Sequence, residues 1–208
     1  TVYAGGWDGK VYALDARSGL LQWNFVTGGV VDSSPAVVDG VVYVGSFDGY
    51  VYALKASSGT VALDAFSSDV MWKYKTGDMV MLSSPAFSNG VLYIGSYDGN
   101  MYALNASNGK HIWNFTTGYA VVSSPAVAKG VVYVGSEDDT VYALNASDGT
   151  LIWNYTTGSL IHFSSCAVAG NMVYVGSFDG NVYALNASNG FPVWNYSTGD
   201  VVISSPSV

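Results

Sequence analysis

The fold is decided by one stretch of the chain, residues 83–118, which reads SSPAFSNGVLYIGSYDGNMYALNASNGKHIWNFTTG. It contains four short apolar runs, each bounded by Gly, Asn or Asp, as is typical of strands joined by tight turns. We expect strands over residues 83–87, 91–96 and 100–104 and a last strand around 113–115. The pairs Asn89-Gly90 and Asp98-Gly99 are hairpin signals. The stretch therefore predicts one four-stranded antiparallel sheet.

The same pattern recurs along the whole chain. A Gly-x-x-Asp marker places Asp8, Asp48, Asp98, Asp138 and Asp179 at intervals of 40, 50, 40 and 41 residues. The long interval has a clear cause, because repeat two carries an inserted loop at about residues 60–70. Repeats of about 40 residues whose strands are apolar on both faces fit the blades of a β-propeller. One tryptophan recurs at a fixed place in each repeat, and we expect these side chains to be structural wedges between blades: Trp23, Trp72, Trp113, Trp153 and Trp194.

The sequence thus predicts a single all-β domain over residues 1–208, a five-bladed β-propeller with four-stranded antiparallel blades. Residues 1–6 resemble a second strand without a first, and residues 204–208 resemble a first strand without a blade after it. We expect these ends to pair and close the ring, which would remove the sheet edges. Two alternatives stay open. The chain could belong to an array of seven or eight blades, or its last strand could insert into the next molecule and build a head-to-tail filament.

Composition excludes several classes of partner. Fifteen acidic residues against seven basic ones give a net charge of −8, which would repel a nucleic-acid backbone. The apolar stretches are interrupted well before the roughly 20 residues that a membrane-spanning helix needs. Cys166 is the only cysteine, so no disulfide framework is expected. It stands where four other repeats have proline, and we expect it to be buried and unreactive.

One segment carries a family resemblance. Residues 103–113, ALNASNGKHIW, resemble the tryptophan-docking motif Ala-x-Asp-Ala-x-x-Gly-x-x-x-Trp of the PQQ-like repeat β-propellers, and residues 13–23 match it with Asp15 in the Asp place. The resemblance covers essentially the whole chain and implies a propeller fold. The family includes quinoprotein dehydrogenases and the scaffold lipoprotein of outer-membrane assembly. The dehydrogenases resemble eight-bladed rings with a vicinal disulfide and a calcium-bound quinone, whereas this chain has one cysteine and five repeats.

No catalytic constellation is visible in the sequence. His111 and His162 are the only histidines, and they lie in different repeats without metal-ligand spacing. We interpret both as incidental surface or packing residues. We therefore expect no enzyme activity, no metal and no cofactor, and a PQQ-dependent dehydrogenase is the least favoured function.

The turn between the second and third strands is the candidate binding feature. In a propeller the five turns lie on one face, and in four repeats an aromatic residue precedes the aspartate. Carboxylates beside exposed aromatic rings suit peptides, sugars or cations. Turn formation alone is the competing explanation for Asp and Gly. The candidate residues are Trp7, Asp8, Phe47, Asp48, Tyr97, Asp98, Asp138, Phe178 and Asp179.

Six N-glycosylation sequons form a second recurrent feature, two in each of repeats three to five. Their asparagines are Asn105, Asn114, Asn145, Asn154, Asn186 and Asn195. Together with the acidic composition they favour an extracellular or cell-surface protein whose signal segment has been removed. The predicted function is a non-catalytic binding or scaffolding module for a protein or glycan partner, existing as a monomer or as head-to-tail assemblies. A lectin-like multivalent sugar-binding propeller is the first alternative.

Overall fold

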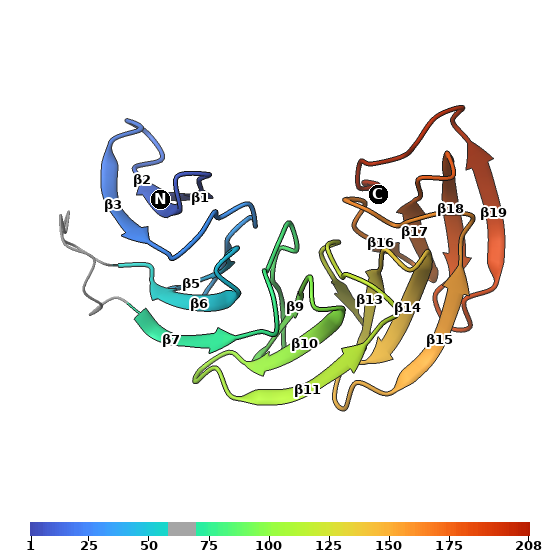
Figure 1. Ribbon diagram of the computed structural model, residues 1–208, viewed down its shortest axis with the longest axis horizontal. Coiled ribbons are helices and arrows are strands. Elements are labelled where there is room, and N and C mark those ends of the chain that lie inside the picture. Colours follow the sequence, from blue (N-terminus) through green and yellow to red (C-terminus); the bar gives the residue numbers. More distant parts are fainter. Residues whose placement is uncertain (58–69) are drawn as a thin grey trace.

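A computed structural model describes residues 1–57 and 70–208. The insertion predicted in repeat two falls largely on residues 58–69 and lies outside the described residues. Within the described part every regular element is a β-strand, and the strands form five sheets arranged side by side along an arc (Figure 1). The all-β propeller with five blades is thereby confirmed.

The strands follow one another through the blades in sequence order. Blade one contains β1 (Val2–Gly5), β2 (Lys10–Leu14) and β3 (Leu21–Val26). Blade two contains β4 (Ala36–Val38), β5 (Val41–Gly45), β6 (Tyr50–Lys55) and β7 (Val70–Lys75). Blade three contains β8 (Ala86–Ser88), β9 (Val91–Gly95), β10 (Asn100–Asn105) and β11 (His111–Thr116). Blade four contains β12 (Ala126–Ala128), β13 (Val131–Gly135), β14 (Thr140–Asn145) and β15 (Leu151–Thr156). Blade five contains β16 (Ala167–Ala169), β17 (Met172–Gly176), β18 (Asn181–Asn186) and β19 (Pro192–Ser197).

Each blade is an antiparallel meander in which neighbouring strands pair in order. The innermost strand is shorter than the sequence predicts, because β8 begins only after Pro85, which has no N–H group to donate. The turn from β8 to β9 has positive φ at both Asn89 (50°) and Gly90 (78°), the geometry of a tight hairpin turn that Asn-Gly favours. The hairpin predicted there is therefore present.

The ring closure that the sequence predicts is not seen. Blade one has three strands, β1-β2-β3, and residues 201–208 form no strand. Figure 1 shows the two chain ends on opposite sides of the opening of the arc. The physical reason is curvature, since neighbouring blades are rotated by too little for five of them to complete a turn.

A row of side chains across each sheet sets the packing between blades. In blade three the row is Ala86, Tyr93, Ala103 and Trp113, one residue from each strand. The small alanine between the two large rings lets them tilt toward one another, with ring centroids 5.8 Å apart. The ring of Trp113 then covers Gly149 of blade four, where a Cβ would lie only 2.7 Å from the indole. A glycine is thus required at this point of the next blade.

Two hydrogen bonds lock the same interface. Trp113 Nε1 and Tyr93 Oη both donate to the carbonyl oxygen of Ala146 in blade four, at 3.0 and 2.9 Å. The equivalent pair of bonds is present at each of the other three blade boundaries, to Ala56, Ala106 and Ala187. Four of the five recurrent tryptophans are accordingly 4–9% exposed, whereas Trp194 of the last blade is 46% exposed.

Candidate functional site

The five aspartates of the Gly-x-x-Asp marker lie in the turns that follow the second strand of each blade. In blade three the Asp98 carboxylate accepts hydrogen bonds from the N–H group of Asn100, from Tyr102 Oη at 2.7 Å, and from the N–H group of Gly77 in the preceding blade at 2.6 Å. The same three kinds of donor surround Asp48, Asp138 and Asp179. We call this arrangement the aspartate clamp. It shapes the turn and fastens one blade to the blade before it.

The clamp also shifts the ionisation of its members. Burial of Tyr183, followed by its hydrogen bond to the Asp179 carboxylate, raises the pKa of that phenol to about 12. Burial alone would raise the pKa of Asp179, but the hydrogen bonds from Tyr183, Asn181 and Gly158 outweigh it and hold this pKa below its ordinary value. Asp179 is therefore an ionised acceptor at neutral pH, as a clamp requires.

Asp8 departs from the pattern because no glycine N–H group among the described residues donates to it. Its carboxylate accepts from Tyr12 Oη and forms an ion pair with Lys10 at 3.3 Å, and the side chain is exposed. The hydrogen bond from Tyr12 is the main cause that lowers the pKa of Asp8. In blade one, Lys10 thus pairs with the aspartate that in the other four blades accepts a hydrogen bond from a glycine N–H group.

A groove with a volume of about 290 Å³ opens on the turn face at blade three, between the loops that join this blade to blades two and four. Two tyrosine rings, Tyr97 and Tyr119, and two carboxylates, Asp78 and Asp98, contribute to its lining. Tyr119 is 57% exposed, and Asp78 is exposed beside it. The Asp98 carboxylate already accepts four hydrogen bonds, whereas the Asp78 carboxylate accepts one, from the Met79 N–H group at 2.7 Å, so Asp78 has the greater remaining acceptor capacity. Aromatic faces next to a carboxylate suit the cationic side chain of a partner.

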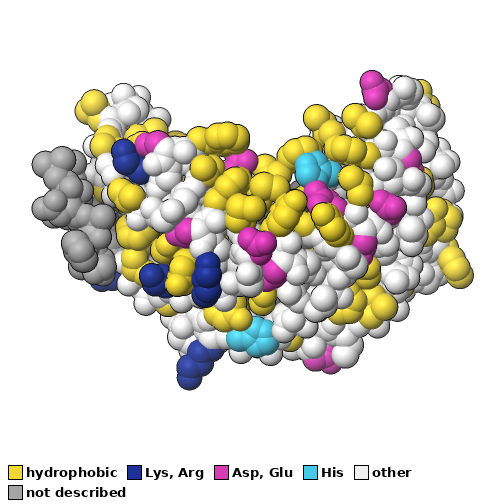
Figure 2. Space-filling model, in the orientation of Figure 1, with side chains coloured by type: hydrophobic (Ala, Val, Ile, Leu, Met, Phe, Trp, Pro, Cys, Tyr) yellow, Lys and Arg dark blue, Asp and Glu magenta, His cyan; other side chains and the backbone are white. Residues whose placement is uncertain are grey.

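The other predicted aromatic residues of this face are placed unequally. Trp7 is 76% exposed and donates from Nε1 to Asp32 at 3.1 Å, whereas Phe47 and Phe178 are partly buried. Figure 2 shows hydrophobic side chains gathered along the inner rim of the arc with acidic side chains beside them. The structure thus brings the predicted residues onto one face, but it spreads them over five blades and does not converge them on one point.

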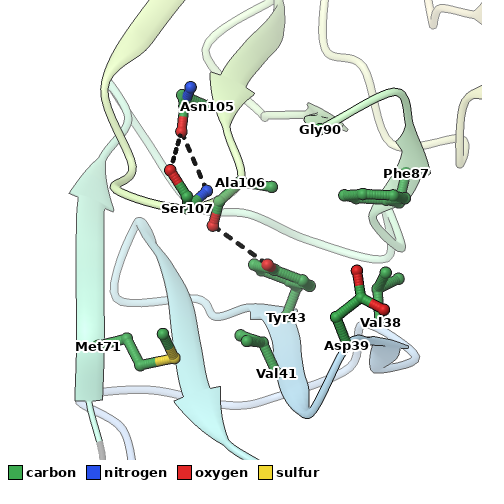
Figure 3. A pocket seen from close by; sticks show the side chains of 10 residues that line it. All are labelled: Val38, Asp39, Val41, Tyr43, Met71, Phe87, Gly90, Asn105, Ala106 and Ser107. Carbon is green, nitrogen blue, oxygen red and sulfur yellow. Dashed lines mark hydrogen bonds between the residues drawn. The ribbon is translucent and has the colours of Figure 1, made fainter.

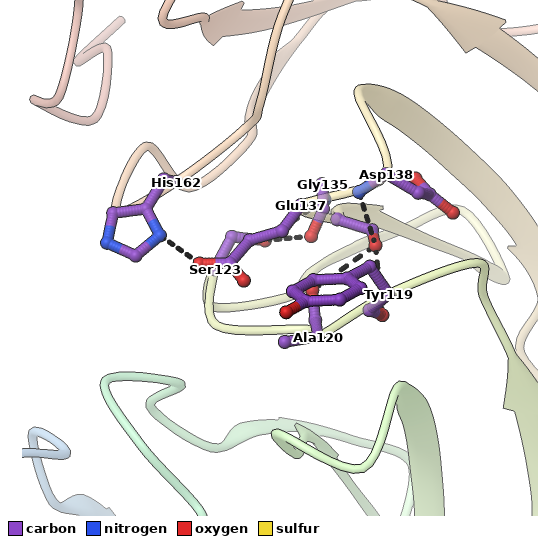
Figure 4. A network of polar contacts seen from close by, with 8 residues as sticks. Tyr119, Ala120, Ser123, Gly135, Glu137, Asp138 and His162 are labelled. Atoms are coloured by element: carbon purple, nitrogen blue, oxygen red, sulfur yellow. Dashed lines mark hydrogen bonds and ion pairs between the residues drawn. The ribbon is translucent and has the colours of Figure 1, made fainter.

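Blade four breaks the aromatic pattern with Glu137, and the structure gives this residue a partner. His162 Nδ1 contacts the Glu137 carboxylate, which is 8% exposed (Figure 4). The imidazole also meets Phe163 and Phe178 edge-on, with centroids 3.7 and 5.4 Å away. His162 is therefore partly buried, and its contact with Glu137 ties the loop before blade five to blade four.

The opposite face carries a groove at the boundary of blades two and three, with a volume of about 350 Å³ (Figure 3). Tyr43, Phe87, Val38 and Met71 supply apolar walls, and the Asn105-Ala106-Ser107 turn lies at its edge. Tyr43 Oη is already bonded to the Ala106 carbonyl. Equivalent grooves recur at the next two boundaries, with volumes of about 430 and 160 Å³, so these grooves arise from the repeat geometry itself.

The six sequon asparagines fall into two structural classes. Asn105, Asn145 and Asn186 end third strands, and their side-chain oxygens accept from the N–H and hydroxyl groups of the sequon serine. Asn114, Asn154 and Asn195 lie on outer strands and are exposed. Asn114 differs from the last two because its amide nitrogen donates to Asn100. The outer-strand class presents the more open surface.

The remaining chemistry-bearing residues do not converge. Cys166 is 7% exposed, and burial raises the pKa of its thiol to about 12. His111 lies on the outer strand of blade three against Asn114 and Tyr74. Among the described residues no group of three His, Cys, Asp or Glu side chains is arranged to hold a metal ion. The described part of the chain likewise holds no helix long and apolar enough to cross a membrane.

Sequence reasoning missed four participants in these contacts. The clamp tyrosine stands four residues after each aspartate in all five repeats, for example Tyr102 after Asp98, and this spacing could have revealed it. Tyr119 and Asp78 of the groove lie in loops between blades, away from the marker. The partner of Glu137 carries no repeat signal, because Glu137 stands where the other repeats have an aromatic residue and the position of His162 varies from repeat to repeat.

Fold and clamp together define the class of protein: a β-propeller of PQQ-like repeats in which tryptophans dock onto the next blade and aspartates clamp the previous one. A family model described as "Outer membrane protein assembly factor BamB" matches residues 1–77 and 57–204. The chain belongs to this family. The resemblance inferred from the tryptophan-docking motif is therefore confirmed.

Solved structures agree on the fold. The computationally designed Ika8 protein aligns with a TM-score of 0.83 at 18% identity, over 97% of this chain and 60% of its own. BamB from Moraxella catarrhalis aligns with a TM-score of 0.63 at 20% identity, over 99% of this chain and 76% of its own. The chain thus spans 60% of the length of Ika8. No curated protein matches the sequence.

Proposed function

We propose that this chain is a non-catalytic protein-binding scaffold that acts outside the cell or at its surface. Support comes from membership of a family described as an assembly factor, together with the groove lined by Tyr97, Tyr119 and Asp78 on the turn face. The groove carries the proposal, because it combines the exposed ring of Tyr119 and the partly buried ring of Tyr97 with a carboxylate that takes no part in the clamp. The net charge of −8 favours partners with basic segments.

The proposal is tested with peptides selected from a random library on the immobilised chain. We expect the selected peptides to be rich in Lys, Arg and aromatic residues and to bind at least about tenfold more weakly to Tyr119→Ala and Asp78→Asn. The matched control is Phe87→Ala, which alters the groove on the opposite face. Peptides that bind all three variants as well as the parent chain would refute the assignment of this groove.

The lectin-like alternative draws on the aromatic rings of the same face, since a tyrosine or tryptophan ring also stacks on sugars. Several such rings on one arc would give multivalent binding, in which avidity exceeds the affinity of a single site. A glycan array probed with the parent chain and with a Tyr97→Ala, Phe178→Ala double variant separates the two functions. Glycan binding lost in the double variant would favour the lectin, and an array without binding would remove it.

The extracellular location rests on the six sequons. Asn154 and Asn195 are exposed on outer strands, where a glycan would not disturb blade packing and would cover an exposed strand edge. Intact-mass analysis of the chain secreted from a glycosylating host provides the test. We expect modification of these two residues, and an unmodified mass would count against the proposed location.

A further inference from the structure

The three grooves on the face opposite the clamps differ in the charge of one turn residue. The turn between the first two strands of a blade places Asp39, Asn89 and Lys129 at the same position, with φ of 48°, 50° and 51°. Each of these residues lines the groove between its own blade and the next one. The charge at this position therefore changes along the arc from negative through neutral to positive.

The groove between blades four and five already holds an ammonium group of the protein itself. Lys129 Nζ donates to the carbonyl oxygen of Gly170 in blade five at 3.0 Å, so this side chain spans the boundary between the two blades. The volume of this groove is about 160 Å³, the smallest of the three. The repeat geometry thus accommodates an alkyl chain that ends in an ammonium group.

The groove between blades two and three has the opposite charge and an unused acceptor. Figure 3 shows the Asp39 side chain extending from its turn toward the space between the Tyr43 and Phe87 rings. Within the described residues no hydrogen bond or ion pair engages the Asp39 carboxylate. Burial, followed by the charge of Asp39, raises the pKa of Tyr43, so the carboxylate acts on the wall of the groove.

The walls of this groove suit the carbon chain of a cation. Phe87 and Met71 contribute to its lining, and Met71 is 46% exposed. The equivalent positions of the following blades carry smaller or branched aliphatic residues: Val127 and Val168 for the phenylalanine, Ile112 and Ile152 for the methionine. An aromatic ring attracts a cation, a thioether packs adaptably against methylene groups, and a carboxylate forms a charge-assisted hydrogen bond with an ammonium group.

We propose that the groove between blades two and three binds one primary alkylammonium group, with its nitrogen at the Asp39 carboxylate and its methylene chain against Phe87 and Met71. The bound group takes the place that the Lys129 side chain fills between blades four and five. A free small amine and a lysine side chain of a partner protein carry this same chemistry. Peptides selected on the chain separate this site from the turn-face groove, because a peptide bound here loses affinity in Phe87→Ala and not in Tyr119→Ala.

The test is a titration of the chain with n-butylammonium chloride at constant ionic strength, followed by the NMR signal of the Met71 methyl group. Met71→Leu assigns this signal, and the methyl groups of Met79 and Met81, outside the groove, are internal references. We expect the Met71 signal to shift to saturation. n-Butanol, which has the same shape without the charge, should bind at least about tenfold more weakly.

A second titration, with Nα-acetyl-lysine methylamide, distinguishes the two sources of the ammonium group. Saturable binding of this compound shows that a lysine side chain fits the groove while it is attached to a polypeptide backbone. Saturable binding of n-butylammonium alone identifies a free small amine as the ligand. The absence of a saturable shift with both compounds would overturn the proposal.

Variants of the turn residue test the role of its charge. Asp39→Asn installs the residue type of the next groove and should weaken binding at least about tenfold. Asp39→Lys copies the groove between blades four and five and should abolish binding, because the new ammonium group occupies the site. The matched control is Asp148→Asn, which removes the same charge from an exposed turn outside the groove and should bind like the parent chain.

Circular dichroism verifies that each variant is folded. Equal affinities for n-butanol and n-butylammonium would show a merely apolar groove and overturn the proposal. Equal losses in Asp39→Asn and Asp148→Asn would do the same, because binding would then depend on the net charge of the chain and not on this carboxylate.

Discussion

At the scale of single residues, one carboxylate in each of blades two to five stabilises its own turn, its own sheet and the contact with the preceding blade. Asp98 orders its own turn through the Asn100 N–H group, its own sheet through Tyr102, and the neighbouring blade through Gly77. A partly buried carboxylate with three donors is stabilising because every donor it satisfies would otherwise lose a partner. The aspartate is therefore needed for packing as well as for the turn.

We predict that Asp98→Ala lowers the free energy of unfolding by about 3 kcal/mol, because it leaves the Tyr102 hydroxyl and the Gly77 N–H group without their acceptor. Urea denaturation monitored by tryptophan fluorescence gives the value. The matched control is Asp8→Ala, which removes an exposed aspartate without a preceding blade and should cost less. Equal losses for the two variants would show that the contact with the preceding blade contributes nothing.

A second residue-scale prediction concerns Asp139. It takes the place of a turn glycine in blade four and has a φ of 70°, a conformation that costs most residues free energy. Asp139→Gly should therefore raise the free energy of unfolding by about 0.5 kcal/mol. The gain is smaller than the backbone strain that is relieved, because glycine loses more conformational entropy on folding than aspartate does. The reciprocal change Gly99→Asp in blade three should be destabilising. A loss of stability in Asp139→Gly would show that its side chain is needed where it is.

At the scale of elements, the boundary between blades is the repeating unit of stability. One alanine carbonyl oxygen accepts hydrogen bonds from both the tryptophan indole and the tyrosine hydroxyl of the preceding blade. The indole also packs against a glycine of the same blade as the alanine. Because the contact recurs with nearest neighbours only, stability is expected to be roughly a sum over blades and boundaries.

Removing one phenol tests this boundary. Tyr93→Phe deletes the donor to Ala146, and we expect a loss of about 1 kcal/mol, at the low end for a buried bond because Trp113 still donates to the same oxygen. Tyr174→Phe makes the same chemical change in blade five, where the hydroxyl has no alanine carbonyl as acceptor among the described residues, and in this chain it should be close to neutral. Thermal unfolding of the two variants side by side measures the difference.

Sequence reasoning succeeded on the elements because the signals there are local. The strands of blade three were predictable from residues 83–118, because this one repeat contains the apolar runs, the turn residues and the recurrent tryptophan. Ring closure was not predictable, because it depends on the rotation between blades, which no residue pattern within a repeat reports. The same holds for the His162 and Glu137 pair, whose members are 25 residues apart and occur once.

At the scale of the whole molecule, the clamps make stability depend on pH. Burial, with the aspartate next, raises the pKa of Tyr142 and Tyr183 to about 12, from an ordinary value of 10.0. A raised pKa means that the folded chain holds these protons more tightly than the unfolded chain. The stabilisation is therefore complete below pH 10 and is lost as the pH rises toward 12.

We accordingly predict a steep fall in the urea midpoint between pH 10 and pH 12, accompanied by tyrosinate absorbance on unfolding. The Tyr142→Phe, Tyr183→Phe double variant is less stable at neutral pH and should show a shallower fall, since two of the titrating groups are gone. A double variant with the same slope as the parent chain would place the alkaline sensitivity elsewhere.

The open arc predicts a gradient of local stability along the chain. Blades two to four have a neighbour on each side, whereas β19 in blade five is exposed along its whole length and β1 has no innermost strand beside it. Amide hydrogen exchange at low concentration should therefore be fastest in β1 and β19 and slowest in β9, β10 and β13, whose residues are largely buried. Uniform protection across the five blades would contradict this gradient, because β1 and β19 would then have to be covered as well as the strands of the inner blades.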